Sequence, residues 1–569
     1  MKQLAVPALE ETLDRFLTVV EPIVDATTLT TTREAVEAFR RGDGPEAQRL
    51  LEEFATDEHA AGRSWLSQAW LDGYLGVRER LPLTSNTVFE LAWADGRGVT
   101  LAADVAAGFA HVGLQYLRGE YEIPPTPRGD AICPSQFTFL AGGIRRPGRG
   151  LDVIEPGSDE AAGREIVVIA RGHGYRLVVA DDAGQVLPRA ALAAALQEIW
   201  EATPREQGLF ARPAYAGGDD AADLWDELTA TTEGRATYDV LRDALFVLVL
   251  VENGGSTEEF VQAGLAGVDE AFPYKTVSLR VDLAGGQVGM HMEHSTLDGG
   301  TITSVIEAAQ HHAPDDDADQ AGSGSAAWSS LTWAPTPQLR ARLTRVGEAF
   351  EHHAAGYRFR IITEPWSLPE SVPFPFSLDA CCQAVMLYAQ LATYGRVRST
   401  YESVDMREFQ AGRTECLRPN TPQAVALARA LVDDTATPQM LADAMAAHRE
   451  QVKVAKTGRA VDRHLFALHL IAQREGLAAP LVGDAGYTAM TTDFLSTTSL
   501  GSRDQIVRTA FAPTSPGGFG LYYSATPQDI DVCVNVDQSE ATHAAFEEAL
   551  REGARKMAGL LAEAASEDA

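Results

Sequence analysis

Basic residues are scarce in this sequence. Its 569 residues include 47 Lys and Arg against 80 Asp and Glu, which gives a formal net charge of −33. A nucleic-acid-binding surface needs clustered Lys and Arg to replace phosphate counterions, so nucleic acid is not expected as a partner. The same charge disfavours an anionic membrane surface. We expect an acidic, solubilising surface.

Long apolar runs and paired cysteines are also missing. No run of eighteen apolar residues could cross a membrane, and the first residues lack the charged and apolar regions of a signal peptide. Cysteines occur only at 133, 381, 382, 416 and 533, an odd number without metal-binding spacing. They fit reduced thiols. We therefore expect a cytoplasmic protein without a membrane or metal site.

The chain is long enough for two domains, and helical and strand patterns alternate along it. The first 120 residues have helical periodicity, and strand patterns follow at 165–170, 174–180, 275–283 and 287–294. A polar stretch at 312–327 is the best linker candidate. Beyond it we expect helices at 337–354, 379–395, 421–432, 437–450, 463–475 and 540–564, and strands at 490–499, 505–512, 518–524 and 529–536. This order predicts two α/β layers, each with a mixed sheet.

A histidine at the end of a predicted strand is the first candidate for chemistry. His294 is followed by a Gly-containing turn with Asp298. Histidine is the usual general base for a hydroxyl, and an aspartate four residues later can orient the imidazole. Alone, such a pair is more often an ordinary surface feature.

Two further groups of polar residues accompany it. Ser496 to Ser499 end a short apolar strand, and clustered hydroxyls can donate to a developing oxyanion. Tyr401, Thr414 and Arg463 offer two hydroxyls and a guanidinium, which together suit a carboxylate ligand.

In this order, these segments resemble the carnitine/choline acyltransferase family. The similarity begins at Val6-Pro7-Ala8-Leu9 and continues through Trp65-Leu66-Ser67, Tyr394-Gly395 and Gly518-Phe519-Gly520-Leu521-Tyr522-Tyr523. It extends over nearly the whole chain.

The resemblance implies two domains similar to chloramphenicol acetyltransferase, with an active-site tunnel at their interface. Residues 1–80 would be helices packing with the C-terminal domain, 81–336 the domain carrying the catalytic histidine, and 337–569 the domain carrying the other site residues. His294 falls on the family's catalytic base, Asp298 on its acidic partner and Ser499 on the hydroxyl that stabilises the oxyanion. Thr497 and Thr498 stand beside it.

 The resemblance thus implies a monomeric O-acyltransferase of fatty acid metabolism that needs no bound cofactor.

The acceptor is expected to be carnitine. Carnitine enzymes of the family hold the carboxylate with a tyrosine, a threonine and an arginine, and Tyr401, Thr414 and Arg463 stand at the three matching positions. Choline enzymes typically lack the threonine and the arginine. A buried arginine is costly without an anionic partner, which favours an anionic acceptor. Phe511 matches the aromatic residue that packs against the trimethylammonium group.

The donor is expected to be acyl-CoA, yet the sequence departs from the family here. CoA-using members carry two lysines that bind the 3′-phosphate, and Leu368 and Val372 stand at these positions. Asp379 and Glu402, which resemble residues near the pantetheine arm, are kept. Either Arg358, Arg360 or Arg398 supplies the missing charge, or the donor is the pantetheine arm of an acyl carrier protein. Carrier proteins are usually acidic, which counts against the second alternative.

The remaining expectations concern the length of the acyl group and two alternative classes of protein. Thr509 stands near the position where short-chain members carry a bulky residue, so a medium or branched acyl group is expected to fit. A hydrolase with Ser499 as nucleophile would need a neighbouring base, and no nucleophile-elbow pattern surrounds that serine. A non-catalytic binding protein would be expected to lack His294 or Ser499, and both are present.

Overall fold

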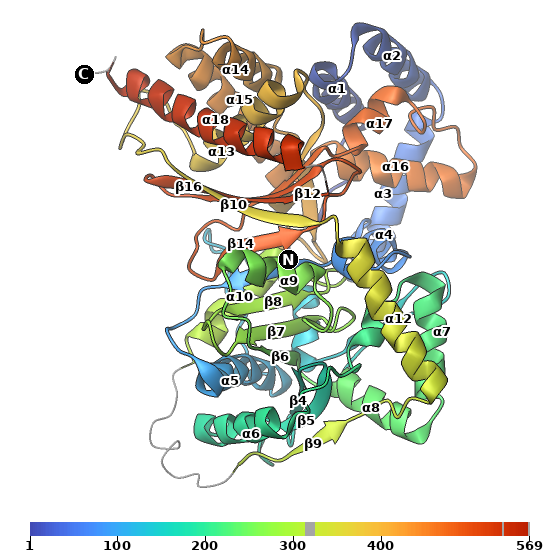
Figure 1. Ribbon diagram of the computed structural model, residues 1–569. Coiled ribbons are helices and arrows are strands. Elements are labelled where there is room, and N and C mark those ends of the chain that lie inside the picture. The colour runs from blue at the N-terminus through green and yellow to red at the C-terminus, as the bar shows by residue number, and fades with distance from the viewer. Residues whose placement is uncertain (313–324, 538–539, 567–569) are drawn as a thin grey trace.

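Two mixed β-sheets organise the chain, one in each half of the molecule (Figure 1). The computed structural model describes residues 1–312, 325–537 and 540–566. The sheet of the lower half in Figure 1 has eight strands in the order β14-β1-β8-β7-β6-β4-β5-β9, and that of the upper half has six in the order β10-β16-β15-β13-β11-β12. The predicted fold class, two mixed α/β halves, is confirmed.

The eight-stranded sheet is covered by helices on both faces. Residues 166–169 and 247–250 of its inner strands are apolar throughout and successive residues point to opposite faces, so each face needs a separate cover. Ile166 and Val168 face α5, α6 and α10, whereas Val167 and Ile169 face α7, α8 and α12. The strands are β1 (Thr87–Leu91), β4 (Glu165–Ala170), β5 (His173–Val178), β6 (Val247–Val251), β7 (Val277–Asp282), β8 (Val288–Met292), β9 (Trp328–Leu331) and β14 (Ile506–Phe511). The helices of this half are α5 (Gly98–Leu117), α6 (Arg189–Ala202), α7 (Gly218–Thr229), α8 (Thr232–Asp243), α9 (Thr257–Ala266), α10 (Gly299–Gln310) and α12 (Pro337–Ala354).

The six-stranded sheet packs one face on helices and the other on the first half. Phe519, Leu521 and Tyr523 share a core with α13, α15 and α18, whereas Tyr522 and Cys533 contact residues of α9 and β1. The strands are β10 (Arg358–Pro365), β11 (Thr400–Asp405), β12 (Thr414–Leu417), β13 (Leu495–Thr498), β15 (Phe519–Ala525) and β16 (Asp529–Val536). Its helices are α13 (Leu378–Tyr394), α14 (Pro422–Val432), α15 (Pro438–Lys456) and α18 (Glu540–Ser566). A small separate ribbon pairs β2 (Ile144–Arg146) with β3 (Val153–Glu155).

The N-terminal helices form a separate apolar cluster with two helices of the second half. Leu13 and Phe16 of α1 lie with Leu465 and Leu468 of α16 in one core. The members of this cluster are α1 (Leu9–Val20), α2 (Ala26–Arg41), α3 (Gly44–Ala60), α16 (Asp462–Glu475) and α17 (Ala485–Thr491), which lie together in Figure 1. The next helix, α4 (Ser67–Leu75), lies closer to the centre of the molecule.

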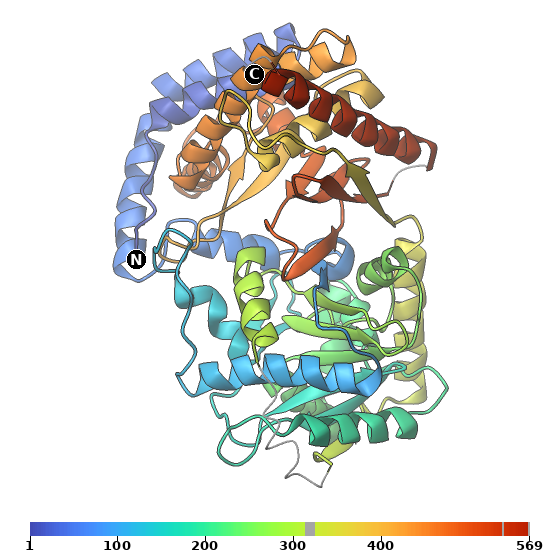
Figure 2. The same cartoon turned by 90° about the vertical axis from the view of Figure 1, so that its left-hand side faces the viewer.

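Two segments beyond residue 336 lie with the first half instead of the second. Strand β14 pairs antiparallel with β1, with Phe511 opposite Thr87, so the chain of the second half completes the first sheet. Figure 2 shows β14 reaching down from the upper half. Helix α12 buries Leu343 and Phe350 in the core beneath the eight-stranded sheet. Sequence periodicity could not assign these segments, because an apolar face does not specify the sheet that it covers.

The predicted elements are otherwise close to those observed. The strands expected at 165–170 and 174–180 form the β4–β5 hairpin, and those at 275–283 and 287–294 form β7 and β8. The strand expected from 490 starts only at Leu495, because α17 occupies the preceding residues. Most of the predicted linker at 312–327 lies outside the described residues. Among the described residues, no helix is both long and apolar enough to span a membrane.

Candidate active site

A cavity of about 1000 Å³ lies between the two halves. The first half supplies its wall from β1, β8, β14 and α10, and the second half from β11, β13 and α16. The predicted site residues that line it are His294, Asp298, Tyr401, Thr414, Arg463, Thr497, Thr498, Ser499 and Phe511. Residues up to 217 positions apart in the chain therefore meet at one cavity, whereas Asp379 and Glu402 do not belong to its lining.

His294 is held with one ring nitrogen free for proton transfer. It follows the end of β8 by two residues, and its Nδ1 lies 2.7 Å from the carbonyl oxygen of Leu297. A carbonyl can only accept, so Nδ1 carries the hydrogen and Nε2 is left as the basic nitrogen. The Tyr74 ring packs beside the imidazole, with 5.4 Å between the ring centroids. This tautomer is the one that a general base requires.

Asp298 contacts His294 less closely than we expected. Its Oδ1 lies 3.7 Å from Nδ1, and the hydrogen bond that orients the ring goes to Leu297 instead. The carboxylate is bound by Arg413 at 2.8 and 3.0 Å and by Gln136 at 2.9 Å. Burial raises the pKa of Asp298, but the charge and hydrogen bonds of Arg413 outweigh burial and leave this pKa below its ordinary value. An electrostatic role of Asp298 toward His294 stays a prediction.

Arg413 is a site residue that the sequence did not single out. Besides Asp298, its guanidinium donates to the carbonyl oxygens of Ser295 at 2.6 Å and His294 at 3.0 Å. One side chain of the second half thus holds the histidine loop of the first half. In the sequence, its position directly before Thr414 was the only indication that Arg413 belongs to the site. The pairing with Asp298 is visible only in the fold.

The acceptor end of the cavity is built around Arg463. Its Nη2 donates to the Tyr401 hydroxyl at 3.2 Å and lies 3.5 Å from the Thr414 hydroxyl, while Nε donates to the Thr414 carbonyl at 3.1 Å. Burial lowers the pKa of Arg463, yet the neighbouring Tyr401 and Glu415 favour the charged form and leave this pKa raised. Tyr401, Thr414 and Arg463 are therefore brought together as the sequence predicted.

The charge of Arg463 has no carboxylate in contact. Within the described parts of the chain, no Asp or Glu oxygen lies within 4.0 Å of its guanidinium. The nearby Arg418 differs, because it pairs with both Asp462 and Asp493. Burial raises the pKa of Glu415 to about 7, although Arg463 lowers it, so this neighbour is only partly ionised near neutral pH. Arg463 is thus a half-buried cation at the cavity wall that can take an anionic ligand.

Trp70 of α4 is a second residue that the sequence reasoning missed. Its ring lies under the Arg463 guanidinium, 4.0 Å from the ring centroid, and its indole N–H is buried without a hydrogen-bond partner. The ring lines the same cavity. Trp70 entered the sequence argument only as part of a family pattern, and nothing local to it indicates contact with Arg463.

The hydroxyls after β13 have different surroundings. Thr497 is buried, donates to the Tyr401 carbonyl at 2.7 Å and accepts from Gln383 at 2.9 Å. Its hydroxyl therefore holds β13 against β11. Thr498 and Ser499 are half-buried at the cavity, where the Ser499 hydroxyl accepts from the Gly501 N–H, at 3.4 Å. Ser499 therefore keeps a proton that it can donate to an oxyanion.

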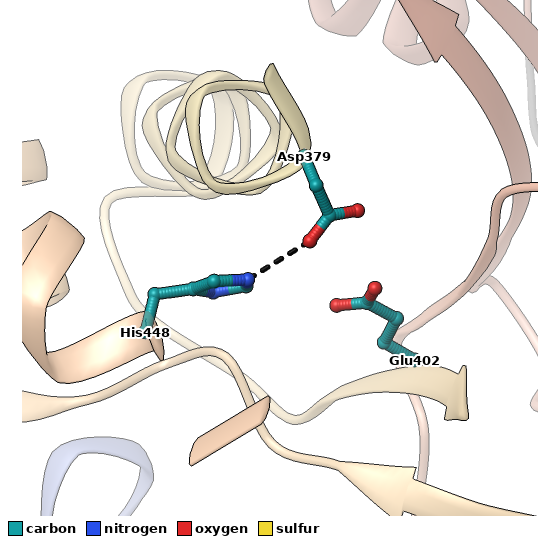
Figure 3. A group of neighbouring side chains, drawn as sticks. All are labelled: Asp379, Glu402 and His448. Carbon is teal, nitrogen blue, oxygen red and sulfur yellow. Dashed lines mark hydrogen bonds and ion pairs between the residues drawn. The ribbon is translucent and has the colours of Figure 1, made fainter. Parts of the chain in front are cut away.

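Asp379 and Glu402, predicted for the donor, lie in a separate cluster with His448 (Figure 3). Asp379 contacts His448 Nε2 at 2.9 Å and accepts from the Tyr523 hydroxyl at 2.6 Å. Tyr523 has only one hydrogen, so its 3.1 Å contact with Glu402 requires a proton on the glutamate. Burial and the nearby Asp379 charge raise the pKa of Glu402, which agrees with this assignment. The cluster is thereby joined by hydrogen bonds of its own members, although Glu402 Oε2 has no partner among the described residues.

The segment expected to bind the CoA phosphate is apolar in its contacts. Leu368 and Val372 pack against the core of the second half. Arg358 is the first residue of β10, and this segment follows the last residue of that strand, roughly 23 Å away at the usual rise per residue. Asp379 lies at the start of α13, whereas Arg398 follows the end of that helix and stacks on Phe494. Arg360 faces Glu258. None of these three arginines is placed to substitute for the lysines.

The sequence matches a known protein family over most of its length. The family model for choline/carnitine O-acyltransferases matches residues 4–552. The chain belongs to this family. It is 25% identical to bovine mitochondrial carnitine O-palmitoyltransferase 2, over 95% of this chain and 88% of that protein. It is also 23% identical to human choline O-acetyltransferase, over 98% of this chain and 79% of that protein.

Solved structures add a more distant likeness. Trichothecene 15-O-acetyltransferase from Fusarium sporotrichioides has a TM-score of 0.35 and 10% identity, covering 86% of this chain and 94% of that one. Family membership makes this chain an O-acyltransferase, which transfers acyl groups to or from a hydroxyl. The two named relatives act on different alcohols, so the acceptor has to be argued from the site.

Proposed function

We propose that this protein transfers an acyl group reversibly between a thioester and the hydroxyl of carnitine. The observation that carries the proposal is Arg463, a half-buried guanidinium beside Tyr401 and Thr414, in the same cavity as the free Nε2 of His294. Choline has no carboxylate to neutralise this charge, whereas carnitine has one. A cation held partly out of water without an anionic partner is unfavourable, and a carboxylate ligand would offset that cost.

The other end of the acceptor fits the same cavity. Phe511 lines it from β14, and an aromatic face attracts a quaternary ammonium by roughly 0.5–2 kcal/mol. Binding the carboxylate at Arg463 and the ammonium near Phe511 fixes the two ends of carnitine. Its hydroxyl then lies between them, toward His294, and such positioning contributes much of the rate.

The proposed reaction needs one base and no acyl-enzyme. His294 Nε2 removes the proton from the carnitine hydroxyl, and that oxygen attacks the thioester carbonyl. Ser499 donates a hydrogen bond to the tetrahedral oxyanion. The C–S bond then breaks, and the thiolate takes the proton from Nε2, which restores the neutral imidazole.

For the donor we propose acyl-CoA, recognised mainly through its thioester and pantetheine arm. The apolar contacts of Leu368 and Val372 leave the 3′-phosphate without the lysines found in CoA-using relatives. A carrier-protein thioester is the alternative, since it presents the same arm without the phosphate. The net charge of −33 opposes an acidic carrier protein.

Thiol release measures the proposed reaction directly. Acyl-CoA is mixed with the protein and carnitine, choline or no acceptor, and free thiol is followed together with the acylated alcohol by mass spectrometry. We expect thiol and acylcarnitine in equal amounts, with choline at least about 100-fold poorer in kcat/KM because it leaves Arg463 unpaired. Equal rates with choline would refute the carnitine assignment, and thiol release without any acceptor would indicate a hydrolase.

A further inference from the structure

Thr509 places a buried hydroxyl without a partner in the cavity wall. The residue is 1% exposed, and its Oγ1 makes no hydrogen bond to any residue that the structure describes. Side chains alternate along β14, so Thr509 and Phe511 face the cavity, whereas Ala510 packs with Tyr522 on the other face. An unpaired hydroxyl is unfavourable in such a wall, where valine would have the same shape without this cost.

The strand register places Thr509 deeper than the reaction centre. One row across β14, β1 and β8 contains Phe511, Thr87 and Met292. Met292 of this row lies two residues before His294 in the chain. Thr509 lies in the next row, with Phe89 and Met290. This row is about 7 Å farther from the histidine along the strands. Arg463 belongs to the opposite half of the molecule, so the deep row is left for the acyl chain.

The surroundings of Thr509 leave its hydroxyl to the ligand. Phe89, Met290 and Met292 are buried and apolar. The hydroxyl and methyl group of threonine are similar in size, so a rotation about Cα–Cβ to another staggered position can turn Oγ1 toward the cavity. An alkyl chain in this row would leave the hydroxyl unpaired, whereas an acyl chain with a hydroxyl or carbonyl group would satisfy it.

We propose that the acyl pocket is built for acyl groups bearing a hydroxyl or oxo substituent, which Thr509 Oγ1 recognises by a hydrogen bond. This inference rests on the proposed acyl transfer to carnitine and names the class of acyl group. Thr509 is then a residue that determines specificity, with no part in proton transfer.

The test compares polar and alkyl acyl groups of one length. Transfer to carnitine is measured as kcat/KM for hexanoyl-, 3-hydroxyhexanoyl- and 5-oxohexanoyl-CoA, and each polar substrate is expressed as a ratio to hexanoyl-CoA. In the unchanged protein we expect at least one ratio of about 10. Thr509→Val should reduce that ratio to about 1, and Thr509→Ser, which keeps the hydroxyl, should retain it. Thr87→Val makes the same chemical change one row away and should leave the ratio as it was.

The outcomes separate this inference from the function on which it rests. Ratios of 1 or below for both polar substrates in the unchanged protein, or a high ratio that survives Thr509→Val, would overturn it while acyl transfer to carnitine stands. Loss of the ratio in Thr87→Val as well would also overturn it, because the selectivity would then belong to the general shape of the pocket. Absence of transfer from every thioester would refute the proposed function itself.

Discussion

The acceptor and donor sides of this protein differ in how their polar groups are satisfied. On the acceptor side, Arg463 and the Trp70 indole face the cavity, and neither contacts an anion among the described residues. On the donor side, Tyr523 bonds to Asp379 and Glu402 outside that cavity, Glu402 Oε2 has no partner among the described residues, and Leu368 lies in an apolar segment. An unpaired cation at the cavity indicates a missing anionic ligand, whereas one unpaired carboxyl oxygen outside the cavity does not indicate a substrate. The structure therefore constrains the alcohol more strongly than the thioester.

The largest expected effect comes from the base between the two sides. His294→Ala should lower kcat by about 10⁴-fold, because no other group on the cavity replaces the Nε2 proton acceptor. Steady-state thiol release and thermal unfolding measure activity and fold together. His352→Ala, an exposed change on α12, is the control and should change neither. Activity of His294→Ala within tenfold of the unchanged protein would remove the base from the mechanism.

Substitution of Arg463 tests whether the acceptor side selects carnitine over choline. Arg463→Met should lower kcat/KM for carnitine by roughly 10³-fold, since a buried carboxylate loses its charge partner, while the value for choline falls far less. Comparing the two alcohols in the same variant cancels general damage to the fold. A parallel loss with both would show that Arg463 supports the structure rather than the acceptor carboxylate.

Acid should weaken the helices that carry the acceptor site. His464, next to Arg463, contacts the Thr12 hydroxyl through Nδ1 and Gln48 through Nε2, and burial lowers its pKa to about 3. Its ordinary pKa is about 6.5, so the neutral form stabilises the fold above that pH, and this contribution is lost as pH falls from 6.5 toward 3.

Urea unfolding at pH 7 and pH 5 measures this loss. We expect His464 to account for about 2 kcal/mol of the decrease between the two pH values. His464→Gln cannot be protonated and should show a smaller decrease. His352→Gln changes an exposed histidine and should behave like the unchanged protein. An identical decrease in all three proteins would exclude His464 as the sensitive group.

The smallest effects are expected on the donor side. Acyl-CoA and the same acyl chain on pantetheine should differ by no more than about threefold in kcat/KM, because Leu368 and Val372, at the positions of the family's lysines, offer no charge to the 3′-phosphate. Leu368→Lys together with Val372→Lys should raise the preference for CoA by about tenfold, and Leu368→Gln with Val372→Gln controls for polarity alone. A CoA preference above 100-fold in the unchanged protein would reveal a phosphate site elsewhere.

The sequence indicated individual residues of the site but not the contacts between them. The place of His294 after a strand made it a candidate, and the resemblance to the family gave it the role of base. Its hydrogen bond to Leu297 and the pairing of Asp298 with Arg413 were not predicted. The first depends on the exact geometry of one loop and the second on contact between the two halves, to which residue order is insensitive.

The sequence by itself determined the periodicities of the helices and strands, the types of chemical group available and the resemblance to the family. These properties are local or depend on residue order. The tertiary structure decided that β14 completes the opposite sheet, that Trp70 lies under Arg463 and that Asp379 and Glu402 lie outside the cavity. These contacts join residues far apart in the chain, and only the packing of the two halves on each other brings them together.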